Sequence, residues 1–347
     1  MSLCLFDLTL SELQARLAAQ GEKTFRAAQI WQGAYRDLVL SYEEMTTLPA
    51  GLRARLAAEL PLSPLQPIAG QENPDRRTRK TLFRLSDGES IETVLMFYER
   101  RRTLCVSTQV GCPLACAFCA TGASGFTRDL TTGEIVGQVV NAARALHASG
   151  QHLTNVVYMG MGEPFLNLQA TLESIHILNA PEGFGLGARH FTLSTVGIVP
   201  GIERLATEGL QVNLAVSLHA GTDALRDRLV PVNRRYPLSA LLSAVRSYIE
   251  ATRRRVSFEV ALADGLNDAP GQADEIAALL SGLLCHVNLI PLNPIPGQAL
   301  RPSPRARIDA FAARLEAAGI PVTVRLGRGV EIQAGCGQLR SRNGGAH

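Results

Sequence analysis

The sequence predicts an α/β fold: a parallel sheet of alternating strands and helices, closed or nearly closed as a barrel, preceded by a small helical domain and a β-hairpin. Three observations support this prediction. Apolar residues recur at helical spacing through the first sixty residues, the apolar period changes to two from Lys80, and regular alternation of strand-like and helical stretches begins beyond Thr103. Repeated strand–helix units over roughly 240 residues are typical of a parallel barrel.

Residues 1–60 are predicted to form the helical domain. Two segments that fit the capping-box pattern, residues 11–14 and 41–44, each precede a stretch with helical apolar spacing. Two further stretches with this spacing cover residues 25–35 and 51–60. The domain is therefore expected to be compact, helical and accessory to the rest of the chain.

Residues 61–102 are predicted to form a linker and a β-hairpin extension. Three prolines between residues 61 and 67 interrupt the helical pattern, because proline lacks the N–H that a helix interior needs. Two stretches with alternating apolar residues, 82–85 and 91–98, then flank a turn at Ser86-Asp87-Gly88. Alternation on both sides of such a turn predicts a hairpin.

Residues 103–347 are predicted to form the barrel domain. The predicted strands cover residues 104–108, 155–160, 190–196, 212–219, 256–262, 287–292 and 322–326. The predicted helices between them cover residues 132–148, 168–178, 238–252, 272–283 and 304–318. Because parallel barrels carry their chemistry at the C-terminal ends of the strands, the residues that follow each apolar run are the candidates for a functional site.

Composition narrows the class of protein. The chain has 347 residues, seven cysteines and a formal net charge of +3. An odd number of cysteines in a chain of this length fits a reducing compartment rather than a disulfide scaffold. The first ten residues carry Asp7 and no basic leader, and the sequence has no apolar run of about 18 residues. We therefore expect a cytoplasmic protein without a membrane segment, and by default a monomer.

Arginine is distributed unevenly along the chain. It gathers at residues 76–79, 100–102, 234–235 and 253–255, whereas lysine occurs only at Lys23 and Lys80. Because arginine binds phosphate bidentately and stacks on bases, these clusters could form an RNA surface. Codon bias combined with solvated faces is the alternative, and the small net charge does not decide between the two.

Three cysteines, Cys112, Cys116 and Cys119, follow the first predicted barrel strand with the spacing C-x3-C-x2-C. Thiolates so close in sequence can bind one soft-metal centre, such as zinc, copper(I) or iron–sulfur iron. A structural zinc site needs four ligands, and the sequence has no second C-x2-C to supply them. A four-iron cluster held by three cysteines leaves one iron open, where a substrate could coordinate. The alternative is a group of buried free cysteines.

Glycines and small polar residues follow several other predicted strands. Gly160 and Gly162 would let a ligand approach the backbone, and the neighbouring Glu163 carboxylate could accept hydrogen bonds from an amine. Later strand ends carry Ser194, Thr195, Ser217, Leu218, His219 and Asn293. Such groups at successive strand ends are what orienting a small polar cofactor requires. Taken alone, His219 would more often be a structural histidine.

The C-x3-C-x2-C spacing followed by Gly162-Glu163-Pro164 resembles the radical S-adenosylmethionine (SAM) superfamily. More closely, a series of motifs resembles the dual-specificity RNA adenine-C2 methyltransferases that modify 23S rRNA and tRNA. These motifs are residues 105–112, 160–164, 217–220, 288–291 and 336–339, together with the segments 21–23 and 91–94. The resemblance runs over nearly the whole chain, and it implies an incomplete parallel (βα) barrel of the radical SAM type.

The resemblance implies a role for each matching residue. Three cysteines would hold a [4Fe-4S] cluster whose open iron binds the amino and carboxylate groups of SAM, and seven residues would surround SAM. The implied cluster ligands are Cys112, Cys116 and Cys119, and the implied SAM residues are Gly162, Glu163, Ser194, Ser217, Leu218, His219 and Asn293. Cys336 would carry the methyl group, Cys105 would be its redox partner, and Glu92 would be a proton acceptor. A flavodoxin-type electron donor is also implied.

The implied reaction explains the two additional cysteines. Adenine C2 is electron-poor and its hydrogen is not acidic, so a radical is required. One SAM methylates the Cys336 thiolate, and a second yields a 5'-deoxyadenosyl radical that takes a hydrogen from the methylated residue. The carbon radical adds to C2 and links protein to RNA. Loss of the C2 proton, to Cys105 or Glu92, then lets a disulfide between Cys105 and Cys336 release the methylated base. The family's targets are the adenines labelled 2503 in 23S rRNA and 37 in tRNA.

Several alternatives stay open at this point. A relative that methylates C8 of the same rRNA adenine and confers antibiotic resistance shares both additional cysteines, although Gly-Glu-Pro rather than Gly-Glu-Ala favours C2. Another radical SAM enzyme would need only the cluster cysteines, and a non-enzymatic iron–sulfur or zinc regulator would leave the strand-end motifs unexplained. The choice between rRNA, tRNA or both is also open. Glu331 and Gly335 depart from the family pattern without removing a reacting group, and Cys4 and Cys285 are interpreted as structural.

Overall fold

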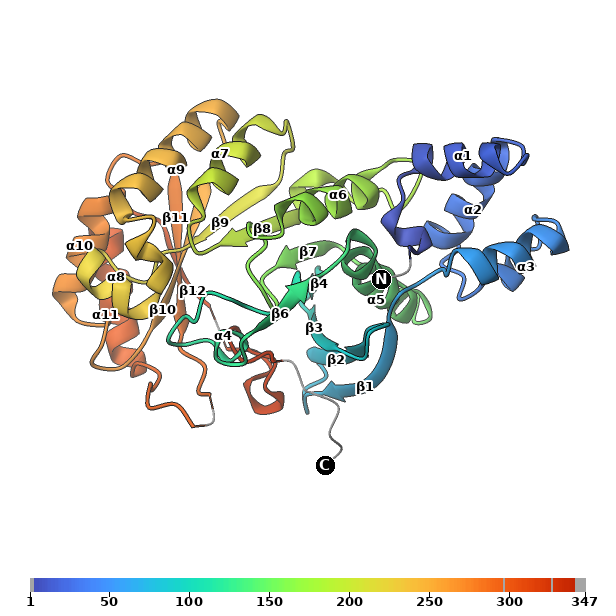
Figure 1. Cartoon of the computed structure of the whole chain (residues 1–347). Coiled ribbons are helices and arrows are strands. Elements are labelled where there is room, and N and C mark those ends of the chain that lie inside the picture. Colours follow the sequence, from blue (N-terminus) through green and yellow to red (C-terminus); the bar gives the residue numbers. More distant parts are fainter. Residues whose placement is uncertain (1–2, 296, 326, 341–347) are drawn as a thin grey trace.

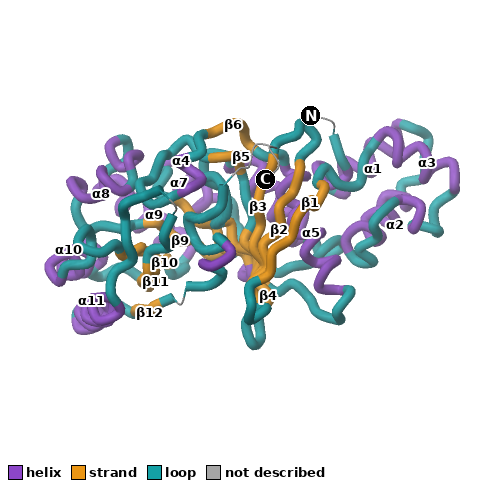
Figure 2. The backbone as a smooth tube through the Cα atoms, turned by 90° about the horizontal axis from the view of Figure 1, so that it is seen from below, coloured by secondary structure: helices purple, strands orange, loops and turns teal. Residues whose placement is uncertain are grey.

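The computed structural model describes residues 3–295, 297–325 and 327–340 (Figure 1). Some residues covered by the predictions above lie outside these ranges. They are residues 1–2 of the predicted helical domain, and Pro296, residues 341–347 and Leu326, the last residue of the seventh predicted strand, in the predicted barrel domain. Within the described ranges there is a ten-stranded main sheet and a separate two-stranded sheet. Figure 2 shows the strands gathered in the middle of the molecule with helices and loops around them.

Residues 3–60, the described part of the predicted N-terminal domain, are helical, as predicted. Three α-helices, α1 (Leu10–Ala19), α2 (Phe25–Tyr35) and α3 (Ala50–Glu59), lie on the side of the molecule away from α10 and α11 (Figure 1). Two short 3-10 helices, Leu5–Asp7 and Tyr42–Glu44, complete the described elements of this region.

The predicted capping boxes are wrong in their positions. Thr9, not Ser11, caps α1: the Glu12 amide donates to the Thr9 hydroxyl at 3.3 Å, and the Glu12 carboxylate accepts from the Thr9 amide at 2.7 Å. Both Thr9 and Ser11 fit the sequence pattern, and the earlier one satisfies the first free amides of the helix. Ser41 precedes only one 3-10 turn, and its side chain makes no capping hydrogen bond.

The helical region packs directly onto the barrel. Asp7 accepts a hydrogen bond from the Gly133 amide at 2.6 Å, Arg144 donates to the carbonyl of Leu38 at 3.0 Å, and Arg36 donates to that of Pro181 at 2.6 Å. Buried apolar side chains of both parts belong to one cluster. The region is therefore joined to the barrel by a continuous core rather than by a bare linker.

The predicted hairpin is confirmed, and a strand that the sequence did not reveal precedes it. Strands β2 (Thr78–Arg84) and β3 (Ser90–Phe97) pair antiparallel, and β1 (Gln66–Glu72) pairs with β2 in the region predicted as a linker. All seven residues of β1 are exposed, so the strand shows no apolar alternation from which it could be predicted.

All seven predicted barrel strands are present and parallel, although most are shorter than predicted. They are β4 (Arg102–Cys105), β7 (Asn155–Tyr158), β8 (Phe191–Thr195), β9 (Asn213–Ser217), β10 (Val256–Leu262), β11 (Cys285–Pro291) and β12 (Val322–Val324). The first predicted strand, 104–108, was predicted to end too late. Strand β4 ends at Cys105, and the chain then forms β5 (Gln109–Gly111), which pairs with β6 (Phe126–Asp129) in the second sheet.

The five predicted helices are confirmed, and three others were missed. The confirmed helices are α5 (Thr132–His147), α6 (Leu168–Asn179), α9 (Leu238–Thr252), α10 (Pro270–Leu280) and α11 (Arg305–Ala317). The missed helices are α4 (Ala120–Ala123), α7 (Val199–Thr207) and α8 (Asp223–Leu229), which are too short to show a clear helical period. None of the helices in the described ranges is both long and apolar enough to cross a membrane.

The barrel is incomplete, because β1 and β12 are the two edges of the main sheet and do not pair with each other. The C-terminal segment, which we define as residues 327–340, reaches from β12 to the hairpin. Arg328 donates to the carbonyl of Phe97 at 3.1 Å, and the Lys80 ammonium donates to that of Gln333 at 3.4 Å. Side-chain and backbone contacts of this segment therefore replace strand pairing at the opening of the sheet.

Candidate active site

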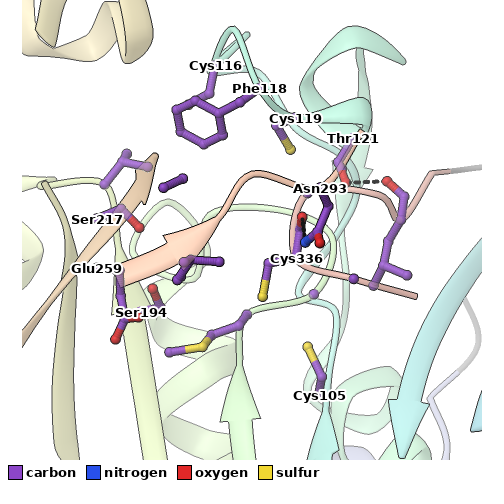
Figure 3. A pocket seen from close by; sticks show the side chains of 18 of the residues that line it. Cys105, Cys116, Phe118, Cys119, Thr121, Ser194, Ser217, Glu259, Asn293 and Cys336 are labelled. Atoms are coloured by element: carbon purple, nitrogen blue, oxygen red, sulfur yellow. Dashed lines mark hydrogen bonds between the residues drawn. The ribbon is translucent and has the colours of Figure 1, made fainter. Parts of the chain in front are cut away.

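One cavity lies at the C-terminal ends of the parallel strands and collects most of the predicted site residues. Five of the seven cysteines line it: Cys105, Cys112, Cys116, Cys119 and Cys336. It is also lined by Gly162, Glu163, Ser194, Ser217, His219 and Asn293. Figure 3 shows side chains from widely separated parts of the chain facing this space. The predicted clustering at the strand ends is thus observed, except for Leu218 and Glu92, which do not line the cavity.

The loop that carries the three clustered cysteines is fixed by backbone hydrogen bonds. Within the loop, the Cys119 amide donates to the carbonyl of Cys116 at 3.1 Å. Outside it, the Cys112 amide donates to the carbonyl of Gly125 at 2.8 Å, and the Ala117 amide donates to that of Leu229 at 3.0 Å. Gly111 precedes the loop with φ +77°, and a Cβ there would overlap the carbonyl of Gly125. The loop conformation therefore requires glycine at this position.

The three thiols are partly exposed and influence one another. Burial raises the pKa of Cys112 to about 12, and the pKa of Cys116 is raised further out of its usual range by burial and then by Cys119 and Cys112. Thiols that disfavour one another's ionisation in this way lie close together, and a bound cation would reverse the effect. Binding iron would therefore release protons from this loop.

The donor set fits a cluster better than a single ion. Among the described residues, no group of three or more His, Cys, Asp or Glu side chains is placed to hold one metal ion. In an iron–sulfur cluster each cysteine binds a different iron, so the thiolates need not meet at one point. Three thiols from one fixed loop, facing a cavity, satisfy that requirement, whereas a closed zinc site would need a fourth ligand at the same centre.

Glu163 joins the ends of two neighbouring strands. Its carboxylate accepts hydrogen bonds from the amides of Phe165 at 3.1 Å and Val196 at 2.9 Å, the latter just beyond β8. Gly162 beside it has φ +96°, and a Cβ there would lie 2.6 Å from the Cβ of Gln109. Burial raises the pKa of Glu163 to about 7. Glu163 lines the cavity, and a carboxylate has lone pairs enough to accept further hydrogen bonds, such as those of an amine.

His219 lines the cavity and has one buried, unpaired donor. Its Nδ1 accepts from the Ala261 amide at 3.0 Å, so the proton of the neutral ring is assigned to Nε2, which is buried and has no partner among the described residues. Burial and then Arg226 lower the pKa of His219 to about 3, which keeps the ring neutral. The ring centroid lies 4.4 Å from that of Phe118 in the cysteine loop. A ligand acceptor would satisfy this buried N–H.

Arg226, which sequence reasoning missed, positions the strand-end motifs. It is fully buried on α8 and donates to the carbonyls of Val196 at 2.5 Å, Ser217 at 3.0 Å and Leu218 at 3.0 Å. Burial lowers its pKa to about 10. No periodicity marks a buried arginine on a seven-residue helix, so the sequence carries no signal for it. Leu218 is held through its backbone, and its side chain is buried outside the cavity.

The other two cysteines that line the cavity, Cys105 and Cys336, are far apart in the sequence. The sulfur atoms of Cys105, at the end of β4, and Cys336, in the C-terminal segment, both point into the cavity (Figure 3). Both are free thiols. The Asn293 amide holds the carbonyl of Cys336 at 3.0 Å, so Asn293 contacts the segment as well as lining the cavity. The predicted proximity of positions 105 and 336 is therefore observed.

Arg325 is a cation that influences both of these thiols. Burial and then the neighbouring Cys336 raise the pKa of Cys105, and Arg325 opposes this rise. Burial by the surrounding protein likewise raises the pKa of Cys336. Arg325 opposes this rise, and Glu259 adds to it. Cys336 is nonetheless exposed, because its thiol faces the open cavity, which protein surrounds on the other sides. Arg325 pairs with Glu259 at 3.4 Å.

Arg325 and Glu259 line the cavity but were not among the predicted site residues. Glu259 is 4% exposed in the middle of β10, where it accepts from Asn288 at 2.8 Å. A charged residue inside an otherwise apolar strand was a usable signal, since such residues are seldom buried without a partner. Arg325 directly follows the three-residue strand β12 and carried no comparable signal.

Glu92 lies beneath the C-terminal segment rather than in the cavity. Its carboxylate pairs with the Lys80 ammonium at 3.1 Å and accepts from the Arg340 amide at 3.2 Å. Both side chains are almost completely buried. The structure thus connects Glu92 to the Cys336 segment through the backbone on the C-terminal side of the cysteine.

The fold and the site together define a radical SAM protein: an incomplete parallel barrel with a three-cysteine loop after its first strand. The family model described as the Radical SAM superfamily matches residues 106–275. The model described as the ribosomal RNA large subunit methyltransferase N-terminal domain matches residues 3–61. The chain is 97% covered by a similar crystal structure, that of a radical SAM methyltransferase from Sphaerobacter thermophilus, with 56% identity, a TM-score of 0.97 and 99% of that chain covered.

Curated relatives identify the family within this superfamily. The protein named "Probable dual-specificity RNA methyltransferase RlmN" from Chloroflexus aurantiacus is 51% identical, with 98% of this chain and 93% of that protein covered. The one of the same name from Geobacillus kaustophilus is 47% identical, with 97% and 92% covered. The chain belongs to the RlmN family.

Proposed function

We propose that this chain is a dual-specificity RNA methyltransferase that methylates C2 of adenine in 23S rRNA and in tRNA. One observation supports this function most directly: Cys105 and Cys336 line the same cavity as the three-cysteine loop. A radical SAM enzyme that only cleaves SAM has no need of two further thiols beside its cluster. The relatives named above are both named as probable dual-specificity RNA methyltransferases.

The cofactors are a [4Fe-4S] cluster and SAM, as membership of the radical SAM superfamily implies. The cluster would be held by Cys112, Cys116 and Cys119, and it supplies the electron that cleaves SAM reductively. The chain's own groups would then orient SAM. The Glu163 carboxylate would accept a hydrogen bond from the amino group of SAM. The unpaired Nε2–H of His219 would donate a hydrogen bond to an acceptor atom of SAM. Ser194, Ser217, Asn293 and the backbone at Gly162 and Leu218 would complete the SAM site.

Cys336 would carry the methyl group and Cys105 would resolve the intermediate. Accepting a methyl group at sulfur requires the Cys336 thiolate, and the Arg325 guanidinium favours that ionised form. In the resolving step an S–S bond would form between the two cysteines while the bond between the Cys336 sulfur and the methylene carbon breaks. That carbon would take up a proton to become the methyl group of the released base, and the surplus electron would pass to the oxidised cluster. Glu92 would accept the proton from C2, a role that requires its carboxylate to reach the substrate from its position beneath the C-terminal segment.

A single-turnover experiment tests the proposed function. Reconstituted protein, SAM, a reductant and 23S rRNA or tRNA fragments are combined without oxygen, and wild type is compared with Cys105→Ala by mass spectrometry. We expect 2-methyladenine from wild type and an RNA cross-link at Cys336 in the variant. Finding 8-methyladenine would assign the chain to the C8 class. An intact cluster that cleaves SAM without methylation or cross-link would refute the RNA substrate.

The remaining partners belong to the same proposal. A flavodoxin-type protein would supply the electron, and the chain would act as a monomer in the cytoplasm. Reduced flavodoxin should replace a chemical reductant in the single-turnover assay, and sedimentation should give the mass of one chain.

A further inference from the structure

A buried ion pair joins β2 and β3 under the C-terminal segment. The Lys80 Nζ lies 3.1 Å from Oε1 of Glu92, and the two side chains are 5% and 2% exposed. Lys80 is one of two lysines in the chain. The strand register pairs Lys80 with Val94 and Glu92 with Leu82, so the two charges meet diagonally across neighbouring strands.

The pair holds the C-terminal segment on both sides of Cys336. The Lys80 ammonium donates to the carbonyl of Gln333 at 3.4 Å, and Oε2 of Glu92 accepts from the amide of Arg340 at 3.2 Å. Both contacts are to backbone atoms, three residues before Cys336 and four residues after it in the printed sequence. The pair therefore spans the part of the segment that carries the reactive thiol.

Glu92 is also fixed to the strand-end motif that follows β7. Its carbonyl accepts from the Ser107 hydroxyl at 2.7 Å, and the same hydroxyl accepts from the Met161 amide at 2.9 Å. The Glu92 amide contacts the Met161 sulfur at 3.4 Å. These contacts of the Glu92 backbone fix its position relative to residues 160–164, whereas its carboxylate contacts the C-terminal segment.

Stability alone does not account for such a pair. Replacing a buried ion pair by apolar residues of similar volume is often neutral or stabilising, because two charges lose their hydration on burial. The segment itself has little regular structure: a 3-10 turn at Val330–Ile332 is followed by irregular backbone through Arg340. A segment of this kind is placed by individual polar contacts rather than by strand pairing.

We propose that Lys80 is a positioning residue: through its ion pair with Glu92 it holds the C-terminal segment so that the Cys336 thiol faces Cys105 in the cavity. The inference concerns the position of a thiol and can be tested without RNA. Its consequence for methyl transfer rests on the proposed function.

Three variants separate positioning from general stability. Lys80→Met removes the cation and leaves Glu92 buried without its partner. Glu92→Gln keeps an acceptor for the Arg340 amide but removes the negative charge. The double variant, Lys80→Met with Glu92→Met, removes the whole pair and leaves no unpaired buried charge, so it should fold even where a single variant fails. Arg307→Met, which breaks the ion pairs of a half-exposed arginine with Asp264 and Asp268 outside the cavity, is the control.

Two readouts are measured on the full chain with its cluster reconstituted. The first is amide hydrogen exchange of peptides covering residues 333–340. The second is the rate at which Cys105 and Cys336 form a disulfide with oxidised glutathione, which is reduced to two molecules of glutathione as the two thiols are oxidised. We expect the double variant to exchange about tenfold faster and to form the disulfide about tenfold more slowly, each corresponding to about 1.4 kcal/mol.

The outcomes are distinct. Arg307→Met should leave both readouts at the wild-type values. Wild-type exchange and disulfide rates in the double variant would overturn the proposal, and so would defects in the single variants that the double variant restores, since the pair would then be purely structural. If the readouts change as expected while wild type methylates no RNA, the positioning inference stands and the proposed function fails.

Discussion

Glu163 is a carboxyl group whose charge is disfavoured by the folded protein. Its pKa rises from 4.5 to about 7 because it is buried, so between these values the native state binds more protons than the unfolded state. The contribution of Glu163 to stability is therefore fully present below about pH 4.5 and is lost as the pH rises toward 7.

Glu163→Gln should remove this part of the pH dependence. In the cofactor-free protein, the free energy of unfolding should fall by up to about 3 kcal/mol between pH 4.5 and 7.5 because of this residue, and the variant should lack that slope. Urea denaturation across this range measures it. The variant has its own cost, since an amide nitrogen facing the Val196 N–H is unfavourable, so the slope rather than the absolute stability is the test. Equal slopes would contradict the assignment.

His219→Asn should weaken SAM binding while preserving the backbone. Asparagine tolerates the left-handed conformation of this position, φ +63°, better than most residues. It removes the buried Nε2–H that has no partner in the described part of the chain. Loss of one such hydrogen bond corresponds to about tenfold in affinity. Equilibrium binding of SAM to the cluster-loaded protein provides the measurement, and wild-type affinity would exclude His219 as a SAM donor.

At the scale of single residues, the sequence was most informative where chemistry imposes a spacing. The loop cysteines, Glu163 and His219 were all predicted to share a site, because each follows an apolar strand whose end could be located. Arg226 and Arg325 were not predicted, since a buried arginine is recognised by the carbonyls and carboxylates around it, and these partners come from other strands. Glu92 was included by resemblance only, and its partner Lys80 was missed.

At the scale of elements, Gly111→Ala should disrupt the cysteine loop. The added Cβ would overlap the carbonyl of Gly125, which accepts from the Cys112 amide, and alanine is strained at φ +77°. Incompatible backbone geometry of this kind costs on the order of 3 kcal/mol locally. The reconstituted variant should hold less than about half the iron of wild type by elemental analysis, since a displaced loop no longer presents its thiolates together.

Gly271→Ala is the matched control for this change. The residue lies in α10, and an added Cβ would meet nothing within 4 Å. Its iron content should equal that of wild type. If Gly111→Ala also bound a full complement of iron, the loop would not depend on the Gly125 contact.

The elements themselves were predicted where their pattern was long. Helix α9 and strand β10 were predicted with the bounds that they have in the structure, because each has a long apolar face. Short or fully exposed elements such as α4, α8 and β1 were missed, since they bury too little to leave a period in the sequence. The residues after Cys105 carry no signal for the end of β4, and for this reason the first strand was predicted to end three residues too late.

At the scale of the whole molecule, the shared core predicts cooperative unfolding. Trp31 is the single tryptophan, is 1% exposed, and packs so closely on Gly183 that a Cβ there would overlap the indole nitrogen. Its fluorescence therefore reports on the contact between the N-terminal helices and the barrel. In urea, the fluorescence transition of the cofactor-free protein should coincide with the loss of helical circular dichroism. A fluorescence midpoint at clearly lower urea would show that the helical region separates first.

The overall architecture was predictable because alternation of strands and helices over a long stretch leaves few possible folds. The closure of the barrel by the C-terminal segment was not predictable. It depends on single contacts between distant positions, such as Arg328 with Phe97 and Lys80 with Gln333, and neither segment has a pattern that specifies the other.

The last described residues of the chain complete the cavity, and this has a consequence for protein synthesis. The Thr121 hydroxyl donates a hydrogen bond to the carbonyl of Leu339 at 2.6 Å, across 218 positions of the sequence. The Ala120 amide donates to the carbonyl of Gly337 at 2.7 Å. Contacts of such long range form late in folding. During translation, Cys105 and the three loop cysteines leave the ribosome long before Cys336 does. A nascent chain that acquired iron early would therefore keep this side of its cavity open to solvent until translation reached the C-terminal segment.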